Sequence, residues 1–440
     1  MKFHFITLGC PKNRVDSEVM FGSLLEHFYE YTDEPQEAEL IVVNSCAFIQ
    51  DAKKESIDTI LEVSEFKKTG KLKKLVVAGC LAQRYQKEIE VLLPEVDHFI
   101  GTGEYYKIAS IVESEQRGNY SIPSYIHAYD APRINSMPFY TAYLKITEGC
   151  NRKCGFCIIP TMRGLQKSQS IENLQEEAQR LVALGVRELN LIGQDLTSYG
   201  TDLKDAKTTL SALLKKLVTI KDLKWIRLLY CYPDKISSEL IEFISSEEKI
   251  CKYLDLPLQH IHNDILQSMR RGVNQTMILN LIDELRNRID KLTLRTSFMT
   301  GYPGESAEHF ETLYGFVKQM EFDHVGVFTY SQEEGTHAET LKGQIDQKVK
   351  EKRKEKLMMV QSEISRKHHQ KKVGSTASVL IENWQESSTL YQGRYEGQAP
   401  DIDGHVYVAS DKALQVGQFY PVRFNKAYTY DLKGTISSGS

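Results

Sequence analysis

The sequence lacks long apolar runs, is sparse in cysteine and carries little net charge. No run approaches the roughly 18 to 20 apolar residues that a membrane span needs, and the first apolar stretch is too short for a signal peptide. Eight cysteines in 440 residues are too few for a disulfide scaffold. A net charge of −4 gives no global positive field to recruit nucleic acid. We therefore expect a cytoplasmic protein whose cysteines remain thiols available to metal.

The first quarter of the chain repeats one pattern three times: a short apolar strand, a cysteine near its end, and a polar helical stretch. The predicted strands are 3–8, 40–43 and 75–78, and the cysteines are Cys10, Cys46 and Cys80. Strands that alternate with helices predict a parallel sheet wound on both faces, in which ligands gather at the carboxyl ends of the strands. We therefore expect a doubly wound α/β domain at residues 1–117, with three thiols along one edge of its sheet.

The strand-helix alternation resumes after a polar, proline-containing linker predicted at residues 118–135. Six strands are predicted, at residues 142–147, 188–192, 225–229, 253–256, 293–300 and 324–328, with helices such as 171–184 and 276–289 between them. About six such units predict a complete or partial (β/α) barrel at residues 136–366, with its active site at the carboxyl ends of the strands.

The C-terminal third changes character twice. Lysine and arginine alternate with glutamate over residues 346–372, which we interpret as the solvated face of a helix that closes the barrel, with Leu357, Val360 and Ile364 turned inward. An RNA-binding arm is the alternative. Short alternating segments at 377–381, 405–409 and 419–424, separated by glycine-rich turns, predict a small antiparallel β-barrel at residues 367–440.

The most specific motif follows the first predicted barrel strand. Cys150, Cys154 and Cys157 form a C-x3-C-x2-C run, with an aromatic residue before the last cysteine. Three thiolates so close in sequence bind three irons of one cubane but do not complete a tetrahedral zinc site, which needs four ligands. In radical S-adenosylmethionine (SAM) enzymes the open fourth iron binds SAM, and an electron from the cluster cleaves its sulfonium. Structural or zinc-bound cysteines are the alternative.

Cys10, Cys46 and Cys80 are a weaker signal, because cysteines spaced 36 and 34 residues apart are also compatible with buried apolar packing. However, each one ends a strand and is flanked by turn-forming residues. We interpret the three as ligands of a second cluster that also has one open iron. Cys231 and Cys251 are interpreted as packing residues and are assigned to no metal.

Ordered motifs along nearly the whole chain resemble the methylthiotransferase family of radical SAM enzymes. The matching stretches are Gly9-Cys10-Pro11-Lys12-Asn13, Asn44-Ser45-Cys46, Gly79-Cys80-Leu81-Ala82-Gln83-Arg84, Cys150 to Cys157 with Ile158-Ile159-Pro160, Met269-Arg270-Arg271-Gly272, and Gly301-Tyr302-Pro303-Gly304-Glu305. The resemblance implies two 4Fe-4S clusters, the auxiliary one on Cys10, Cys46 and Cys80, and a C-terminal TRAM domain with an OB-like barrel. One departure is Lys167-Ser168-Gln169, where the family usually has a further basic pair with serine.

Within the family, one branch modifies an adenosine of tRNA and another modifies an aspartate of small-subunit ribosomal protein twelve. Residues 256–260, 331–336, 399–404 and 430–434 resemble the ribosomal-protein branch. From Val373 onward five Lys and Arg meet seven Asp and Glu, and nucleic-acid affinity depends largely on Lys and Arg that displace counterions. We therefore expect a basic protein substrate that docks on Asp401 and Asp403. The alternatives are that these two are only turn residues, and that tRNA is the substrate.

The resemblance implies that two SAM molecules are used for different tasks, methylation of a sulfur at the auxiliary cluster and radical formation at the other cluster. Gln194 and Asp195, at the end of a predicted barrel strand, are candidate SAM contacts. Arg295 is a candidate partner of the SAM carboxylate, or part of a structural salt bridge. A sulfur donor and an electron donor such as flavodoxin or ferredoxin are also implied. The remaining alternatives are a radical SAM enzyme with another outcome and a non-catalytic iron–sulfur protein that binds the ribosome.

Overall fold

A computed structural model describes residues 1–440 except 124–125, 128–129, 206 and 438–440. Parts of the predicted linker and the end of the predicted C-terminal barrel therefore lie outside the described residues. The chain divides into two compact units. The first comprises Met1–Leu184, Leu191–Leu217 and Ser331–Thr336, and the second comprises Gly185–Asn190, Val218–Tyr330 and His337–Ser440.

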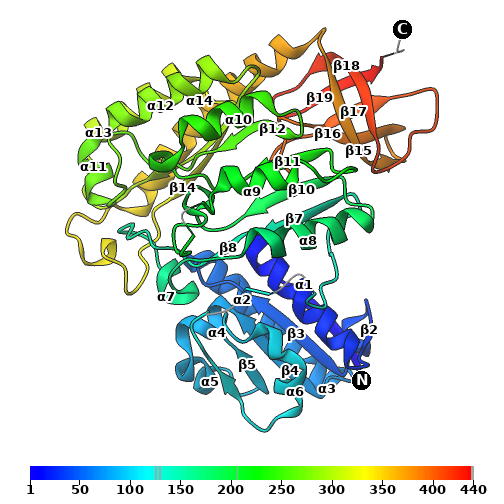
Figure 1. The fold of residues 1–440 in the computed structure, drawn as a ribbon. Helices are drawn as coiled ribbons and strands as arrows, with labels where there is room; N and C mark the ends of the chain where they lie inside the picture. The colour runs from blue at the N-terminus through cyan, green and yellow to red at the C-terminus, as the bar shows by residue number, and fades with distance from the viewer. Residues whose placement is uncertain (124–125, 128–129, 206, 438–440) are drawn as a thin grey trace. The chain divides into compact units, whose positions relative to one another are not determined.

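The first unit contains a six-stranded parallel sheet of order β2-β1-β3-β4-β5-β6 (Figure 1). Its strands are β1 (Lys2–Thr7), β2 (Glu30–Tyr31), β3 (Leu40–Ser45), β4 (Lys74–Gly79), β5 (His98–Ile100) and β6 (Gly118–Asn119). Phe3 pairs with Leu40, and Leu40 with Lys74, so β1, β3 and β4 run side by side. β3 is buried along its whole length, as expected for a central strand of a sheet covered on both faces. The sheet extends one strand beyond residue 117, into the segment predicted as a linker.

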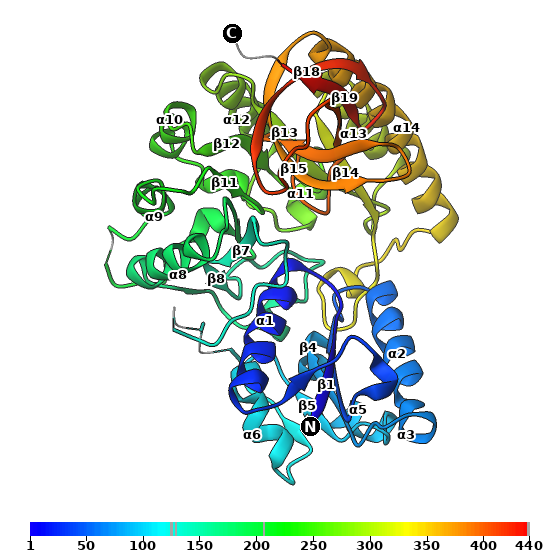
Figure 2. The ribbon, with the colours of Figure 1, turned by 90° about the vertical axis from the view of Figure 1, so that its right-hand side faces the viewer.

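Helices cover both faces of this sheet, as predicted (Figure 2). Apolar side chains of α1 (Pro11–Glu26) and α6 (Ile108–Glu113) pack on one face. Those of α2 (Gln50–Ser64), α4 (Cys80–Tyr85) and α5 (Lys87–Leu92) pack on the other. The short elements α3 (Phe66–Thr69), η1 (Pro35–Glu37) and η2 (Tyr105–Lys107) complete the domain. The predicted doubly wound α/β domain is confirmed.

The second sheet has the order β14-β13-β12-β11-β10-β7 and is built of β/α repeats, the pattern of a partial (β/α) barrel. Its strands are β7 (Thr141–Lys145), β10 (Glu188–Ile192), β11 (Trp225–Leu228), β12 (Ile250–Asp255), β13 (Thr293–Thr300) and β14 (His324–Thr329). The helices are α7 (Ile159–Arg163), α8 (Ile171–Ala183), α9 (Leu210–Leu217), α10 (Ser238–Ser246), α11 (Asn263–Ser268), α12 (Gln275–Arg288) and α13 (Ala307–Met320). The remaining short elements are β8 (Thr147–Glu148), which pairs with β9 (Lys167–Ser168), and the turns η3 (Leu196–Ser198), η4 (Pro233–Lys235) and η5 (Ala338–Thr340).

The charged segment before the C-terminal barrel forms α14 (Gln347–Lys372), which begins at its N-cap Asp346. Leu357 and Ile364 are buried and Val360 is half-buried, so the predicted inward stripe is present. None of the helices in the described part of the chain is long and apolar enough to cross a membrane.

Residues 376–436 form a closed barrel of order β15-β16-β17-β19-β18, which confirms the predicted small β-barrel. Contrary to the prediction, the barrel is not antiparallel throughout, because β17 and β19 pair in parallel while the other neighbouring strands pair antiparallel. Its strands are β15 (Thr376–Gln385), β16 (Leu390–Tyr395), β17 (Val406–Ala409), β18 (Phe419–Ala427) and β19 (Leu432–Ile436). Val379, Val406, Val422 and Phe424 fill its interior. Closure leaves the sheet without open edges, which stabilises so small a barrel.

Candidate active site

Cys46 and Cys80 directly follow the carboxyl ends of β3 and β4, and Cys10 comes three residues after the end of β1, the strand beside β3 in the first sheet. Cys46 and Cys80 are buried and Cys10 is half-buried, and the three thiols interact electrostatically. Burial raises the pKa of the Cys46 thiol and raises that of Cys80 to about 12. Such thiols become thiolates only when positive charge, as from metal, compensates the loss of water. The structure brings this predicted set together.

Two glycines with left-handed backbone let the loops of this triad approach each other. Gly9 has φ of +88°, and a Cβ there would lie 2.8 Å from Cys46 Cβ and 3.1 Å from Cys46 Sγ. Gly79 has φ of +93°, and a Cβ there would overlap Asn44 Oδ1 and lie 2.7 Å from the Ser45 carbonyl. Only glycine combines that backbone conformation with this closeness. Among the described residues, Asn44 Oδ1 is buried without a hydrogen-bond partner, as expected beside a ligand site.

Asn13, on α1, connects the loops of the triad. Its Nδ2 donates to the carbonyls of Leu8 at 3.1 Å and Ser45 at 3.0 Å, just before two of the cysteines. Its Oδ1 accepts from Cys80 Sγ at 3.7 Å and also from Arg163. The asparagine therefore fixes the positions of the thiols relative to one another.

Cys150, Cys154 and Cys157 lie in one loop that begins after β8. Gly149, with φ of +76°, makes the turn, and the Cys150 amide donates to the Gly164 carbonyl at 3.1 Å. Cys150 Sγ accepts from the Arg152 amide at 3.4 Å, and burial raises the pKa of that thiol. Cys154 and Cys157 are half-buried. The loop therefore presents three thiols from one short, closely held segment.

Two of the predicted SAM contacts, Gln194 and Asp195, lie beside this loop. Gln194 Nε2 donates to Glu148 Oε1 at 2.9 Å. Asp195 accepts from Arg152 Nε at 2.9 Å and from the hydroxyls of Thr197 and Ser198, each at 2.6 Å. The Asp195 carboxylate therefore holds the arginine of the cysteine loop.

Unused polar atoms close to these residues indicate a ligand site. Within the described chain, Gln194 Oε1 and Thr147 Oγ1 are buried and accept or donate no hydrogen bond. A Cβ on residue 193 would overlap Thr147 Oγ1, so this position requires glycine. Orphaned polar atoms beside a cradle of three thiols fit a cluster with a bound polar ligand.

Arg295, the third predicted SAM contact, forms an ion pair with Asp255 at 2.8 Å and faces Asp403 at 3.9 Å. This is the structural salt bridge considered as its alternative role, and the contact with SAM stays a prediction. Asp403 also accepts from the Tyr253 hydroxyl and the Ala399 amide, both at 2.8 Å, and its side chain is only 3% exposed. The expectation that the substrate docks on Asp403 is therefore wrong, because the Asp403 carboxylate is buried and bonded to residues of the second unit. Asp401 is exposed.

A buried group of four charges in the first unit has no motif in the sequence: Asp16, Lys145, Glu148 and Arg163. Arg163 Nη1 contacts Asp16 at 2.7 Å and Glu148 at 3.0 Å, while Lys145 pairs with both carboxylates. Burial alone would raise the pKa of Glu148, but Arg163 and Lys145 hold it well below its usual range. No sequence pattern links Asp16 with a lysine 129 residues later.

Glu333, within residues 331–336, has a role that the motif alone did not reveal. Its carboxylate pairs with Lys53 at 2.9 Å and with Arg84 at 2.8 Å, and its side chain is 2% exposed. Ser331 Oγ also donates to it, at 2.6 Å. This loop, late in the chain, is therefore fixed to α2 and α4, the helices next to the auxiliary triad.

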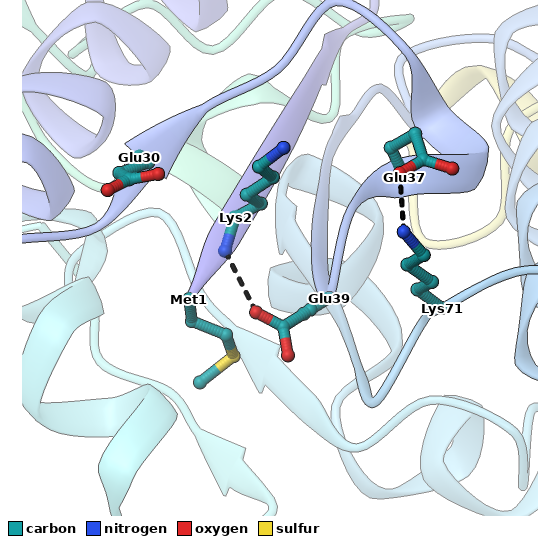
Figure 3. A pocket seen from close by; sticks show the side chains of 6 residues that line it. All are labelled: Met1, Lys2, Glu30, Glu37, Glu39 and Lys71. Carbon is teal, nitrogen blue, oxygen red and sulfur yellow. Dashed lines mark hydrogen bonds and ion pairs between the residues drawn. The ribbon is translucent and has the colours of Figure 1, made fainter.

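A polar pocket of about 340 Å³ lies where β1 begins, at the end of the sheet opposite the cysteines (Figure 3). It is lined by Met1, Lys2, Glu30, Glu37, Glu39 and Lys71. Lys71 pairs with Glu37 at 2.6 Å, and the Lys2 amide donates to Glu39 at 3.1 Å. Because two of the three carboxylates are already paired, Glu37 with Lys71 and Glu39 with Lys73, we assign the pocket no function.

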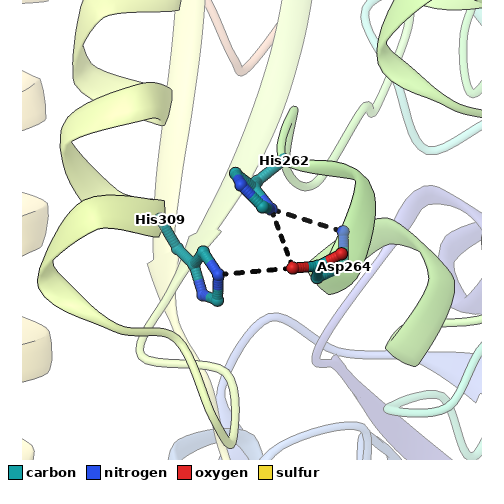
Figure 4. Close-up of side chains that lie close together, drawn as sticks. All are labelled: His262, Asp264 and His309. Atoms are coloured by element: carbon teal, nitrogen blue, oxygen red, sulfur yellow. Dashed lines mark hydrogen bonds and ion pairs between the residues drawn. The ribbon is translucent and has the colours of Figure 1, made fainter.

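His262, Asp264 and His309 form a further group of ligand-type side chains, with ligand atoms that all lie within 4.8 Å of one another (Figure 4). The Asp264 amide donates to His262 Nδ1 at 3.3 Å, and the Ser306 amide to His309 Nδ1 at 3.2 Å. A neutral imidazole has one nitrogen lone pair that accepts a hydrogen bond. In His262 and in His309 that lone pair accepts from a backbone amide at the start of α11 and α13, respectively. We therefore assign this group a capping role and no metal.

Three family models match the chain in succession. The uncharacterized protein family UPF0004 matches residues 2–101, the radical SAM superfamily residues 144–317, and the TRAM domain residues 373–436. Among solved structures, the radical SAM methyltransferase TsrM of Kitasatospora setae, with cobalamin and a [4Fe-4S] cluster bound, has a TM-score of 0.57 and 12% identity over 74% of this chain and 72% of its own. The cobalamin-dependent SAM radical enzyme OxsB has a TM-score of 0.52 and 10% identity over 77% of this chain and 54% of its own. These likenesses show the fold alone.

Full-length relatives are much closer in sequence. A ribosomal protein uS12 methylthiotransferase RimO of Trichlorobacter lovleyi is 47% identical over 98% of this chain and 97% of its own length. The RimO of Myxococcus xanthus is 49% identical over 98% of this chain and 91% of its own length. With that identity along the whole chain, and with the three family models in order, this protein belongs to the RimO family of ribosomal protein uS12 methylthiotransferases.

Proposed function

We propose that this protein is a radical SAM methylthiotransferase that adds a methylthio group to the β-carbon of an aspartate in ribosomal protein uS12. The observation that carries the proposal is the presence of two cysteine triads in one compact unit, each in a cradle of left-handed glycine and buried polar groups. Cys150, Cys154 and Cys157 would hold a 4Fe-4S cluster that binds SAM. Cys10, Cys46 and Cys80 would hold the auxiliary 4Fe-4S cluster.

When bound, these groups supply reductive cleavage of SAM and a site for the sulfur that is transferred. The chain itself provides position and shelter from water. Asp195 pairs with Arg152 and so orients the loop that contains Cys150, Cys154 and Cys157. The unused oxygen of Gln194 is available to a ligand amine, and Arg295 is the candidate partner of the SAM carboxylate. The predicted domain limits, 1–117, 118–135, 136–366 and 367–440, accompany this proposal, although β6 (Gly118–Asn119) belongs to the first sheet and the limit at 366 falls inside α14.

The protein substrate is favoured over tRNA by two independent observations. The full-length relatives carry the name uS12 methylthiotransferase. From Val373 onward, which includes all five barrel strands, seven acidic residues meet five basic ones, which disfavours a phosphate backbone. A cytoplasmic location, a sulfur donor, and an electron donor such as flavodoxin or ferredoxin complete the proposal.

The test is an anaerobic assay of reconstituted protein with reductant, SAM and a sulfide source, offered purified uS12 and unmodified tRNA in separate tubes. We expect a methylthio mass increment on one aspartate of uS12 and none on tRNA nucleosides. The control is the Cys150→Ala, Cys154→Ala, Cys157→Ala protein, which should give no product. A methylthio-adenosine in the tRNA digest, with uS12 unchanged, would assign the chain to the other substrate.

A further inference from the structure

Arg163, at the end of α7, lies between the two cysteine triads of the first unit and is 1% exposed. One side of its guanidinium faces the auxiliary triad. It hydrogen-bonds Asn13 Oδ1, is within hydrogen-bonding reach of the Cys80 thiol, and interacts electrostatically with Cys10 and Cys46.

The other contacts of Arg163 are with residues next to the loop of Cys150, Cys154 and Cys157. Its Nη1 bonds Glu148 Oε2 at 3.0 Å, and the other Glu148 oxygen accepts from the Gly149 amide at 3.2 Å and from Gln194 at 2.9 Å. Glu148 and Gly149 directly precede Cys150. The next residue after Arg163, Gly164, accepts from the Cys150 amide at 3.1 Å. One planar cation with five donors thus bonds Asn13 beside the auxiliary triad and Glu148 beside the Cys150 loop, which suits a guanidinium better than an ammonium.

The surrounding charges show what Arg163 contributes. Asp16 and Glu148 are shared between Arg163 and Lys145, so this buried group of four is neutral. Lys145 hydrogen-bonds the carboxylates of Asp16 and Glu148 and lies over the Tyr105 ring, whereas Arg163 also faces sulfur. Without Arg163 the group would carry a net negative charge next to three thiolates in a site of low dielectric constant.

We propose that Arg163 is a positioning residue shared by both cysteine triads, whose fixed positive charge compensates the thiolates of the auxiliary cluster and whose pairing with Glu148 ties that cluster to the Cys150 loop. This inference rests on the proposed function, because it takes Cys10, Cys46 and Cys80 as cluster ligands. A nearby positive charge favours the reduced, more negative state of an iron–sulfur cluster. The auxiliary cluster should therefore have a more negative reduction potential when Arg163 is neutralised.

The experiment uses full-length protein with Cys150, Cys154 and Cys157 replaced by Ala, so that the auxiliary cluster is the one observed. Its iron content and its midpoint potential, from an anaerobic redox titration followed by EPR, are compared in Arg163→Gln, Arg163→Lys and the parent. Arg133→Gln is the matched control. Arg133 is also buried in the first unit, and its guanidinium bonds the carboxylates of Glu18 and Glu177 and the carbonyl of Tyr143.

We expect Arg163→Gln to move the potential to more negative values, while Arg163→Lys and Arg133→Gln stay close to the parent. If Arg163→Gln fails to retain iron but Arg163→Lys retains it with the parent potential, the requirement for positive charge is equally supported. An unchanged potential in Arg163→Gln, an equal shift in Arg163→Lys, or an equal shift in Arg133→Gln would overturn the proposal. A parent protein that binds no iron would instead contradict the proposed auxiliary ligands.

The tie to Glu148 is tested in the protein with both triads intact. Arg163→Gln should raise the amount of deoxyadenosine formed per methylthiolated uS12 at least severalfold. Without the Arg163–Glu148 pair the two cluster sites would no longer keep a fixed relative position, so fewer radicals would lead to sulfur transfer. Arg133→Gln should leave this ratio unchanged. A ratio in Arg163→Gln equal to that of wild type would show that Arg163 does not align the two sites.

Discussion

Cys150, Cys154 and Cys157 belong to one short loop, whereas Cys10, Cys46 and Cys80 come from the ends of three strands that must first pair in register. The loop triad depends on local contacts, chiefly the turn at Gly149 and the Arg152–Asp195 pair. The strand-end triad depends on the whole first sheet and on Asn13, which joins two of its loops. Two similar sets of three cysteines therefore depend on different parts of the structure and should be sensitive to different substitutions. Defects in the sheet should remove one cluster, and defects near Arg152 should impair the other.

The largest effects should follow from removing each triad. Reconstituted wild type should bind about eight irons, and either triple Cys→Ala variant about four, as expected for two cubanes. Without Cys150, Cys154 and Cys157, SAM cleavage should be lost completely. Without Cys10, Cys46 and Cys80, deoxyadenosine should still form but no methylthio product. Iron analysis and chromatography of the nucleoside check this, and loss of all iron from one triple variant would mean a single shared site.

Gly79→Ala should selectively damage the strand-end triad. The left-handed backbone costs about 1–3 kcal/mol for a side chain, and a Cβ would in addition overlap Asn44. We expect loss of auxiliary iron and of methylthio product, with SAM cleavage retained. Gly374→Ala is the control, because Gly374 has φ of +92° but no atom within 4 Å of its Cβ position. Equal iron loss in both variants would attribute the effect to backbone strain alone.

Glu177, which contacts neither triad, tests the stability of the first unit. Burial alone would raise its pKa, but His127 and Arg133 lower it to about 2. Its stabilising contribution is therefore present above the ordinary pKa, about 4.5, and is lost as pH falls from there toward 2. Glu177→Gln should lower the free energy of unfolding of the apo-protein by about 3 kcal/mol near pH 6. Urea titrations at several pH values should show that deficit shrinking as pH falls, and a constant deficit would contradict the assignment.

Asp195→Asn should affect the loop triad only. Replacing the carboxylate weakens a charge-assisted contact with Arg152, worth about 1.5 kcal/mol or more, so deoxyadenosine formation should fall about tenfold. Auxiliary iron, measured in the variant that lacks the loop triad, should not change. Thr201→Ala serves as the control, since the Thr201 hydroxyl donates to the backbone carbonyl of Ser198 and not to the Asp195 carboxylate. A fall in auxiliary iron in Asp195→Asn would contradict the claim that the two cysteine sites depend on separate contacts.

The smallest effect is expected at Asp401, outside both triads. Asp401→Asn keeps a residue that tolerates its left-handed φ of 61° and removes one exposed charge. The affinity for uS12 should fall by less than about 1 kcal/mol, mainly through slower association at low salt. Asp403→Asn should instead lower the thermal stability of the second unit, because Arg295 and His324 lose a carboxylate partner. Equal effects of the two changes on docking would restore Asp403 as a surface contact.

The fold was largely predictable because its signals are local. The strands at 188–192 and 293–300 were predicted with their observed bounds, since a buried strand between amphipathic helices has a clear pattern. The glycines beside Cys10, Cys80 and Cys150 also marked sharp turns in the sequence. The contacts of Arg163, Glu333 and Asp403 were not predictable, because each joins side chains more than a hundred residues apart. Such pairs are fixed by tertiary packing, for which a single sequence has no period or motif.

The most direct test of the account is mass spectrometry of uS12 from cells that lack this gene and are complemented with wild type or with the Cys10, Cys46 and Cys80 triple Ala variant. The account predicts a methylthio increment on one aspartate of uS12 with wild type, and unmodified uS12 in the deletion strain and with the variant. Unmodified uS12 in cells that express the wild-type protein, or modified uS12 with the variant, would contradict it.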